Sequence, residues 1–256
     1  MDGVLTGRAA YTVQLAQSAA DLRAAQRLRY EVFVRELGAQ ADGTDHSDGL
    51  ERDRFDTVAD HLIARPAGSD DVVGVYRLLR REGAAEVGGF YSEGEYDLAP
   101  LLSGGKRLLE LGRSCLHPDH RGGTALHHLW AALVAYTRAH EIEVLFGTAS
   151  FRGTDPATIA APLSLLQYRH LAPEPLRPRA LATGFQRMDL IADAQLDRRA
   201  AMVEMPSLIK SYLRLGGYVG EGAFVDHRFN TTDVCLVLET ASVDPARLRR
   251  LTQRQT

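Results

Sequence analysis

Residues 107–130, RLLELGRSCLHPDHRGGTALHHLW, predict a strand, a glycine-rich turn and a helix in direct succession. Pro118 and Asp119 end the apolar strand, and the turn follows with Gly122 and Gly123. Beyond Thr124, which we expect to cap the helix, apolar residues recur at helical spacing at positions 126, 129, 130, 133 and 134. Such a turn presents backbone N–H groups and the positive end of the helix dipole, which suit a phosphate. The same pattern also fits a plain tight connection.

Glu110 and Arg113 interrupt the predicted strand, which is otherwise apolar. Buried charges are costly unless they are paired, so charges at these positions indicate either a cleft or a structural ion pair. Strict alternation would place the two side chains on opposite faces, because their spacing is odd. Gly112 lies between them and can host a β-bulge, which would turn both side chains to one side.

The composition limits the class of protein. The 256 residues are 45% hydrophobic and carry a net charge of −3, which allows a large core and argues against a general nucleic-acid binder. Cys115 and Cys235 lie far apart in apolar runs without metal-ligand spacing, so we expect buried thiols of a cytosolic protein. The first ten residues lack the apolar core of a signal peptide, and no apolar run reaches the ~20 residues that span a bilayer. We therefore expect a soluble or peripheral protein.

The rest of the chain predicts strands and helices around the central unit. We expect strands at 11–15, 61–64, 72–79, 143–148, 217–225 and 233–238, and helices at 18–37, 156–168, 206–215 and 244–253. The polar stretch 40–54 predicts a long loop, and the glycine-rich stretch 83–105 predicts an irregular segment that forms part of a pocket wall. This order predicts one α/β domain with its core at about 10–240, in which helices cover both faces of a central mixed sheet.

The element order resembles the GCN5-related N-acyltransferase (GNAT) fold, in which a Q/R-x-x-G-x-G/A turn holds the pyrophosphate of an acyl carrier. His120, Gly123 and Ala125 match that turn loosely, and His120 departs from Gln or Arg. RYEVF at 29–33, DRFD at 53–56, VYRL at 75–78 and ELGR at 110–113 resemble the acyl-homoserine-lactone synthase branch. The chain is still more similar to the ornithine N-alpha-acyltransferases of ornithine-lipid synthesis. That resemblance rests on LRYEVFVRELGA, DRFDTVADHLI, ELGRSCLHPDHRGG and PSLIKSYLRLGGYVGEGAFVDHRFNTTDVCLVL.

The resemblance implies transfer of a (3-hydroxy)fatty acyl group from an acyl carrier protein thioester to the α-amine of ornithine. The attacking amine must lose a proton, and Glu110, in a partly desolvated cleft, is our candidate to take it directly or through water. Backbone N–H groups of the central strand would stabilise the oxyanion, and Arg113 would hold Glu110 or a loop carboxylate in place. No covalent enzyme intermediate is required, so Cys115 need not be a nucleophile.

The synthase-like residues imply where the amino acid binds. They are Arg29, Phe33, Asp53, Asp56 and Arg77. An arginine suits the α-carboxylate of ornithine, and an aspartate suits its δ-ammonium. Asp53 and Asp56 can instead serve only to pin the 40–54 loop to Arg29 or Arg77, and the sequence leaves that choice open.

The acyl donor is expected to bind at the glycine turn through His120, Arg121, Gly122, Gly123 and Ala125. Acyl carrier proteins are acidic, so Lys106 and Arg107, together with Arg121, are expected to form a basic entry for the carrier. No separate cofactor is expected, because the phosphopantetheine arrives on the carrier. The histidines at 117, 120, 127 and 128 predict no metal site, because none has a carboxylate partner at ligand spacing.

Two other classes of protein remain as alternatives. One is a lactone synthase that uses S-adenosylmethionine, against which stand the chain length and the C-terminal segment FVDHRFNTTDV. The other is a non-catalytic member of the fold that only binds acyl carrier protein.

The location expected from the sequence is cytoplasmic, with weak, salt-sensitive contact at the inner membrane face. Four arginines of the terminal segment can attract anionic lipid. They are Arg247, Arg249, Arg250 and Arg254. A solvated terminal helix is the alternative.

Overall fold

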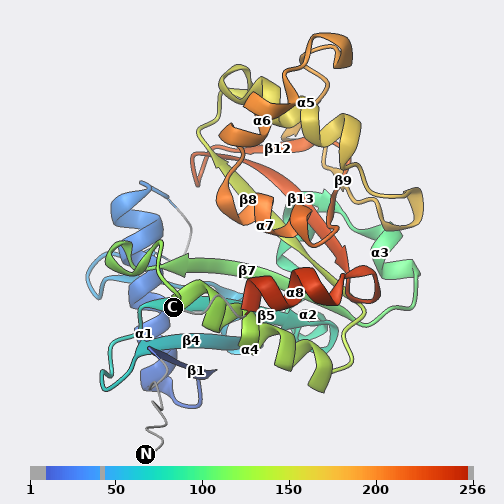
Figure 1. Ribbon diagram of the computed structural model, residues 1–256. Helices are drawn as coiled ribbons and strands as arrows, with labels where there is room; N and C mark the ends of the chain where they lie inside the picture. Colours follow the sequence, from blue (N-terminus) through green and yellow to red (C-terminus); the bar gives the residue numbers. More distant parts are fainter. Residues whose placement is uncertain (1–9, 41–43, 253–256) are drawn as a thin grey trace, which may run out of the picture.

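A nine-stranded sheet runs through the computed structural model, which describes residues 10–40 and 44–252 (Figure 1). Neighbouring strands follow the order β1-β4-β5-β7-β8-β13-β12-β10, and β11 pairs with β13. The bounds are β1 Tyr11–Leu15, β4 Asp60–Pro66, β5 Gly74–Arg80, β7 Leu108–Leu116, β8 Val144–Arg152, β10 Phe185–Gln186, β11 Tyr218–Val219, β12 Ala223–Asp226 and β13 Thr231–Glu239. Strands β7 and β8 are parallel and their neighbours are antiparallel, so the predicted mixed sheet is confirmed.

Helices and two small two-stranded sheets complete the described chain. The helices are α1 Ala19–Arg29, α2 Arg81–Glu86, α3 Ala99–Ser103, α4 Ala125–Ala139, α5 Ala160–Arg169, α6 Arg198–Glu204, α7 Ser207–Arg214 and α8 Pro245–Thr252. The small pairs are β2 Thr44–Asp45 with β3 Leu50–Glu51, and β6 Tyr96–Asp97 with β9 Arg179–Ala180.

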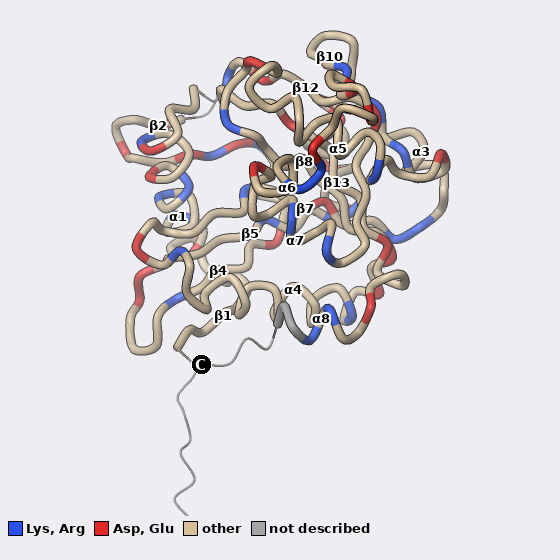
Figure 2. The backbone as a smooth tube through the Cα atoms, turned by 45° about the horizontal axis from the view of Figure 1, so that its top comes forward, with Lys and Arg blue, Asp and Glu red and all other residues tan. Residues whose placement is uncertain are grey.

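Acidic and basic positions are interspersed along the backbone rather than separated by sign (Figure 2).

Helices pack on both faces of the sheet, as predicted. Along β4, Leu62 and Ala64 join the cluster that contains the apolar side of α4, whereas Ile63 joins the cluster that contains the apolar side of α1. This follows from the two-residue period of a strand, which sends neighbouring side chains to opposite faces.

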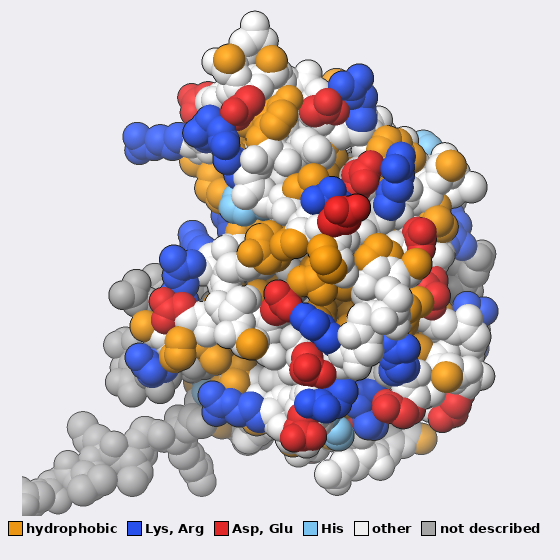
Figure 3. Space-filling model, turned by 90° about the vertical axis from the view of Figure 1, so that its right-hand side faces the viewer, with side chains coloured by type: hydrophobic (Ala, Val, Ile, Leu, Met, Phe, Trp, Pro, Cys, Tyr) orange, Lys and Arg blue, Asp and Glu red, His pale blue; other side chains and the backbone are white. Residues whose placement is uncertain are grey.

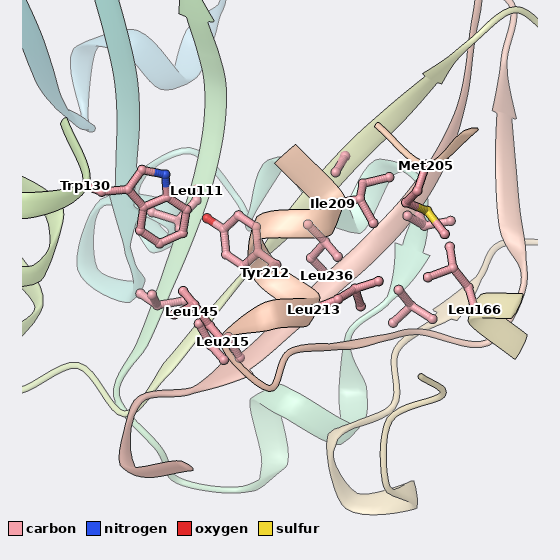
Figure 4. Packing of buried hydrophobic residues seen from close by; sticks show 14 of the residues in the cluster. Leu111, Trp130, Leu145, Leu166, Met205, Ile209, Tyr212, Leu213, Leu215 and Leu236 are labelled. Atoms are coloured by element: carbon pink, nitrogen blue, oxygen red, sulfur yellow. The ribbon is translucent and has the colours of Figure 1, made fainter. Parts of the chain in front are cut away.

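Helix α7 extends the α4 face over β8 and β13. Figure 4 shows Tyr212 of α7 beside Trp130 of α4 and Leu111 of β7. The Tyr212 and Trp130 rings lie 5.1 Å apart, and the Tyr212 hydroxyl hydrogen-bonds the Tyr76 hydroxyl at 2.8 Å. These contacts join the β1–β7 part of the sheet to the C-terminal strands, so the strands that flank the site are held in a fixed relation.

The central strands separate after a short parallel contact. β7 and β8 pair only from Leu108 to Glu110, although each strand continues for six more residues. On the opposite edge, Tyr76 of β5 faces two residues of β7, Arg113 and Ser114, which makes a β-bulge. Arg113 has a φ of +51°, an uncommon conformation for a residue other than glycine. The bulge therefore follows Gly112 directly, where the sequence predicted it.

Several local expectations are refined by the structure. Ser18 and Asp21 form the expected capping box of α1, but the helix continues as a π-helix over Tyr30–Glu36 rather than as a regular helix to 37. The stretch 83–105 contains α3 and most of α2, so it is less irregular than predicted. Thr124 occupies the N-cap position of α4, but its side chain makes no capping hydrogen bond. That prediction was wrong because Thr124 has helical backbone angles, whereas a capping side chain usually sits on extended backbone.

The terminal helix α8 packs against α4. Arg247 is more than half exposed and donates to the backbone carbonyl of Arg214. The side chain of Arg250 and the whole of Arg254 lie outside the described part of the chain. Within residues 10–40 and 44–252, no helix is both long and apolar enough to cross a membrane.

Candidate active site

A cavity of about 250 Å³ lies where β7 and β8 diverge. Strands β5, β7, β8 and β13 line it, together with residues around 91–95 and 226–231. The segment 83–105 therefore supplies part of the pocket wall, as predicted. Glu110 and Arg113 both line the cavity, so the bulge has brought the two charged side chains of β7 to one side.

Glu110 is buried at the point where β7 loses its pairing with β8. Its two carboxylate oxygens accept hydrogen bonds from the backbone N–H groups of Ser92 at 2.6 Å and Tyr91 at 2.8 Å. Burial raises the pKa of Glu110 above its ordinary value, and the donors from Ser92 and Tyr91 offset only part of that rise. A carboxylate with a raised pKa in a cavity has the properties of a proton acceptor that works near neutral pH.

Three arginines and three carboxylates form a closed ring beside the cavity. In order around the ring they are Arg29, Glu51, Arg113, Asp53, Arg77 and Asp56. Each arginine donates to two carboxylates, and each carboxylate accepts from two arginines. The hydrogen bonds of the ring include 2.6 Å from Arg29 Nη1 to Asp56 Oδ1 and 2.6 Å from Arg77 Nη1 to Asp53 Oδ1. The six formal charges cancel, which is how this set can be buried.

The ring keeps its carboxylates ionised. Burial alone would raise the pKa of Asp56, but the charges of Arg29 and Arg77 outweigh burial and hold that pKa well below its usual range. The pKa values of Glu51 and Asp53 are also lowered, because the attraction of the arginines exceeds the effect of burial. These carboxylates are anions that fix arginines, so the geometry does not suit them as proton acceptors.

Arg113 connects the ring to the cavity. Its Nε donates to Glu51 at 3.1 Å and its Nη2 donates to Asp53 at 3.0 Å. The guanidinium carbon also lies 4.6 Å from the Tyr91 ring centre and 5.0 Å from that of Phe229. Of the two partners expected from the sequence, Glu110 or a loop carboxylate, the structure places Arg113 on the loop carboxylates.

The glycine turn lies between β7 and α4, as predicted. Gly122 has a φ of +75°, which glycine adopts at little cost, and a Cβ built there meets no atom within 4 Å. His120 Nδ1 hydrogen-bonds the hydroxyl of Tyr11 at 2.9 Å, which ties the turn to the first strand. Gly123 and the buried Ala125 lead into α4, so the backbone there has the form that suits an anionic group.

The three basic residues expected to form one carrier entry do not lie together. Lys106 and Arg107 precede β7, whereas Arg121 follows its other end, and nine strand residues at ~3.3 Å each place them roughly 25–30 Å apart. Lys106 pairs with Glu239, and Arg121 makes a bidentate pair with Glu36 at 2.6 Å. An extended strand separates its ends by its full length, so the three residues that flank it do not form one patch. On the face shown in Figure 3, basic and acidic side chains are mixed.

A second acidic cluster lines the cavity and was missed by the sequence analysis. Glu95, Asp226 and Asp233 are all buried and offer carboxylate oxygens within 4.8 Å of one another. They come from the segment after η3 at Tyr91–Gly94, from the end of β12 and from β13. The only sequence signal was indirect, since Asp226 and Asp233 bound the segment DHRFNTTD that the resemblance singled out.

Comparison with known proteins shows the family to which the chain belongs. An acetyltransferase (GNAT) domain model matches residues 28–131, which contain the ring, Glu110 and the glycine turn. The chain is 57% identical over 249 residues to the L-ornithine N(alpha)-acyltransferase of Rhodobacter capsulatus, covering 95% of each chain. It is 42% identical to the enzyme of that name from Brucella abortus, covering 93% of this chain and 87% of the relative. The chain belongs to the L-ornithine N(alpha)-acyltransferase family.

The structural comparison supports the fold of this acyltransferase. The solved CoA-dependent acyl-homoserine lactone synthase BjaI is similar with a TM-score of 0.53 at 15% identity. The alignment covers 95% of this chain and 89% of the synthase chain. The GNAT fold expected from the sequence is therefore confirmed.

In this member of the ornithine N(alpha)-acyltransferase family, only some of the five residues expected to bind an amino acid line the cavity. Phe33 and Arg77 line the cavity. Arg29, Asp53 and Asp56 belong to the ring and are not among the residues that line the cavity within the described chain. The ring geometry fits the alternative that Asp53 and Asp56 pin the 40–54 loop to the two arginines.

The cysteines of this family member are buried, as predicted. Burial raises the pKa of the Cys115 thiol to about 12 and also raises that of Cys235. A thiol is nucleophilic mainly as the thiolate, so neither residue fits a nucleophilic role.

Proposed function

We propose that this enzyme transfers a (3-hydroxy)fatty acyl group from an acyl carrier protein thioester to the α-amine of L-ornithine, giving a lyso-ornithine lipid. Two relatives, 57% and 42% identical to this chain, carry the name L-ornithine N(alpha)-acyltransferase. The observation that carries the chemistry is Glu110, a buried carboxylate with a raised pKa at the point where β7 and β8 separate. A thioester that enters between the strands would place its carbonyl group beside that carboxylate.

The reaction requires a neutral amine, a proton acceptor and an oxyanion site. The bound α-ammonium first loses one proton to solvent. The amine nitrogen then attacks the thioester carbon, forming the C–N bond, and its second proton passes to Glu110 directly or through water. Backbone N–H groups on the diverging edges of β7 and β8 stabilise the oxyanion. Cleavage of the C–S bond releases the thiolate, which takes the proton from Glu110 and restores the enzyme.

Acyl carrier protein as the donor is the finer part of the proposal. Carrier and coenzyme A present the same phosphopantetheine arm, so the glycine turn does not choose between them. The choice must come from side chains around the entry, and Arg121 is the basic residue of the predicted entry that lies at the turn. The arm arrives with the donor, so no separate cofactor is needed.

Mass spectrometry of the products tests the proposal. The full chain is incubated with a 3-hydroxyacyl carrier thioester, or the matching coenzyme A thioester, and a panel of amino acids. We expect an N-α-acylated ornithine and release of one thiol per product. A homoserine lactone product formed from S-adenosylmethionine would instead make the chain a lactone synthase. Binding of the carrier without thiol release with any amine would make it a non-catalytic member.

For location, we propose a cytoplasmic enzyme with weak contact at the inner membrane face through the arginines of α8. The exposed Arg247 supports this contact. Flotation with anionic and neutral liposomes across a salt series tests it, since only electrostatic attraction depends on both variables. Binding that ignores salt and lipid charge would contradict the proposal.

A further inference from the structure

The cavity contains a group of acceptors that no step of the proposed reaction uses. Glu95, Asp226 and Asp233 place carboxylate oxygens within 4.8 Å of one another, and each side chain is at most 6% exposed. All three line the same cavity as Glu110. Three carboxylates this close repel one another strongly in a buried place, so their arrangement requires a stabilising partner.

Two oxygens of this cluster have no hydrogen-bond partner in the described part of the chain. They are Glu95 Oε2 and Asp233 Oδ1, both fully buried. Other oxygens of the cluster are paired: the backbone N–H groups of Arg228 and Phe229 donate to Asp226 Oδ1 at 2.7 and 3.3 Å, and the Thr231 hydroxyl donates to Asp233 Oδ2 at 3.2 Å. An unpaired buried acceptor is costly, so the two free oxygens indicate a donor that arrives from the cavity.

The surrounding charges also favour a cation. The acidic side chains that line the cavity are the cluster and Glu110, and the basic ones are Arg77 and Arg113. Both arginines already donate to ring carboxylates. Burial, followed by repulsion from Asp233 and Asp226, raises the pKa of Glu95 well above its usual range. Burial likewise raises the pKa of Asp233 to about 6. Burial and mutual repulsion therefore disfavour the ionised forms of Glu95 and Asp233, and a cation bound among the three oxygens would favour those forms.

An ammonium group fits these acceptors better than a divalent metal. It is a compact charge with three N–H donors, which matches three converging carboxylates. The proposed substrate supplies such a group, whereas Ca²⁺ or Mg²⁺ would need waters or further oxygens beyond these three residues to complete its coordination shell. The cavity also has a separate carboxylate, Glu110, where the reacting amine is proposed to lie.

We propose that Glu95, Asp226 and Asp233 bind the side-chain ammonium of the amino-acid substrate and thereby direct its α-amine to Glu110. The inference rests on the proposed function, because that function supplies a substrate with two amines. It deepens that function by assigning the residues that select a diamino acid. The ammonium held by the cluster stays protonated and cannot attack the thioester, so acylation occurs at the other nitrogen.

The test compares two acceptors that share a carbon skeleton. L-Norvaline lacks only the δ-amine of L-ornithine, so the ratio of their kcat/KM values isolates the contribution of that group. The wild-type chain is compared with Asp233→Asn and Glu95→Gln, which keep the side-chain shapes. Glu82→Gln is the matched control, because Glu82 is a highly exposed carboxylate that lies 4.0 Å from the Arg80 guanidinium.

We expect the preference for ornithine over norvaline to fall about 10- to 100-fold in both cluster variants, the range for losing a hydrogen bond to a charged group. The change should lie mainly in the KM for ornithine, whereas norvaline turnover stays within about threefold and the control keeps the wild-type preference. Equal loss with both acceptors, or an unchanged preference, would overturn the inference.

Thermal unfolding with added ornithine or norvaline separates this inference from the reaction. Ornithine should raise the melting temperature of the wild type more than norvaline does, and the difference should vanish in the cluster variants. If the wild type acylates neither acceptor but shows this pattern, the proposed function fails and the ammonium site stands. If Ca²⁺ or Mg²⁺ raises the melting temperature through the cluster and restores activity lost on chelation, the site is a metal site and the inference is overturned.

Discussion

Replacement of Arg29 by methionine is predicted to destabilise the protein through the ring beside the active site. Arg29 is fully buried and donates to Glu51 and Asp56. Methionine is apolar and flexible and cannot donate to either carboxylate. The variant therefore leaves two buried carboxylates with one arginine each, Arg113 for Glu51 and Arg77 for Asp56.

The magnitude follows from this incomplete compensation. Removing one partner of a buried ion pair costs about 3–5 kcal/mol, chiefly because the other charge is left buried and uncompensated. Each carboxylate here keeps one arginine, so we expect a loss of unfolding free energy near the lower end, about 3 kcal/mol. Arg35→Met provides the control. Arg35 lies in the π-helix that follows α1 and pairs with Glu31 on the surface, where such a pair contributes about 0.3–0.5 kcal/mol.

Urea unfolding of the three proteins, followed by circular dichroism, measures both free energies. We expect the Arg29→Met midpoint to fall clearly and the Arg35→Met midpoint to stay close to the wild type. The slopes of the transitions should agree, which licenses the comparison of free energies. Losses below about 1 kcal/mol for Arg29→Met, or equal losses for both variants, would refute the view that the ring is a cooperative buried network.

Three further predictions concern activity and pH. Glu110→Gln should lower turnover about 10²–10⁴-fold. The loss should lie toward the lower end, because water can share the proton transfer. Near-normal turnover of a folded variant would exclude Glu110 as the base. Arg121→Glu should raise the KM for a carrier-bound donor more than the KM for the coenzyme A thioester, and the difference should shrink as salt is added. Arg107→Glu, at the other end of β7, should not have this effect. Equal effects of Arg121→Glu on both donors would contradict electrostatic steering of the carrier by Arg121. Asp233→Asn should stabilise the unliganded protein at pH 7.5 by on the order of 1–3 kcal/mol, with a smaller gain at pH 5, as measured by urea unfolding. The sign follows because a carboxyl whose pKa is raised on folding binds more protons in the folded than in the unfolded state between about pH 4 and 6, so its contribution to stability is lost as the pH rises through that range. A gain that grows toward acid pH would contradict this reasoning.

Local sequence patterns were enough to predict most of the fold. The alternation at 11–15, the capping box of Ser18 and Asp21, and the strand–turn–helix at 107–130 all appear where expected. These features depend on interactions between residues a few positions apart, so a short stretch carries the whole signal. The π-helix at Tyr30–Glu36 was not predicted, because its side chains follow the same apolar spacing as the preceding turns.

The sequence also indicated Glu110 as a candidate site residue, because a carboxylate is unusual within an otherwise apolar strand. Gly112 further predicted the bulge that turns Arg113 to the same side. The sequence left open the roles of Arg29, Asp53 and Asp56, because it offers each of them more than one partner of opposite charge. Only the folded chain shows that these charges close into a ring.

Tertiary structure alone decided where charged residues meet. Lys106 and Arg121 are near in sequence, yet an extended strand holds them at opposite ends, because each of its residues advances the chain by ~3.3 Å. Glu95 and Asp233 are far apart in sequence, yet strand order brings their carboxylates together in one cavity. Glu95 lies in a polar stretch and Asp233 begins the predicted strand 233–238, and an acidic residue at either kind of position is usually solvated. Their burial, and with it the raised pKa values that mark them, arises only when separate segments close around the space between β7 and β8.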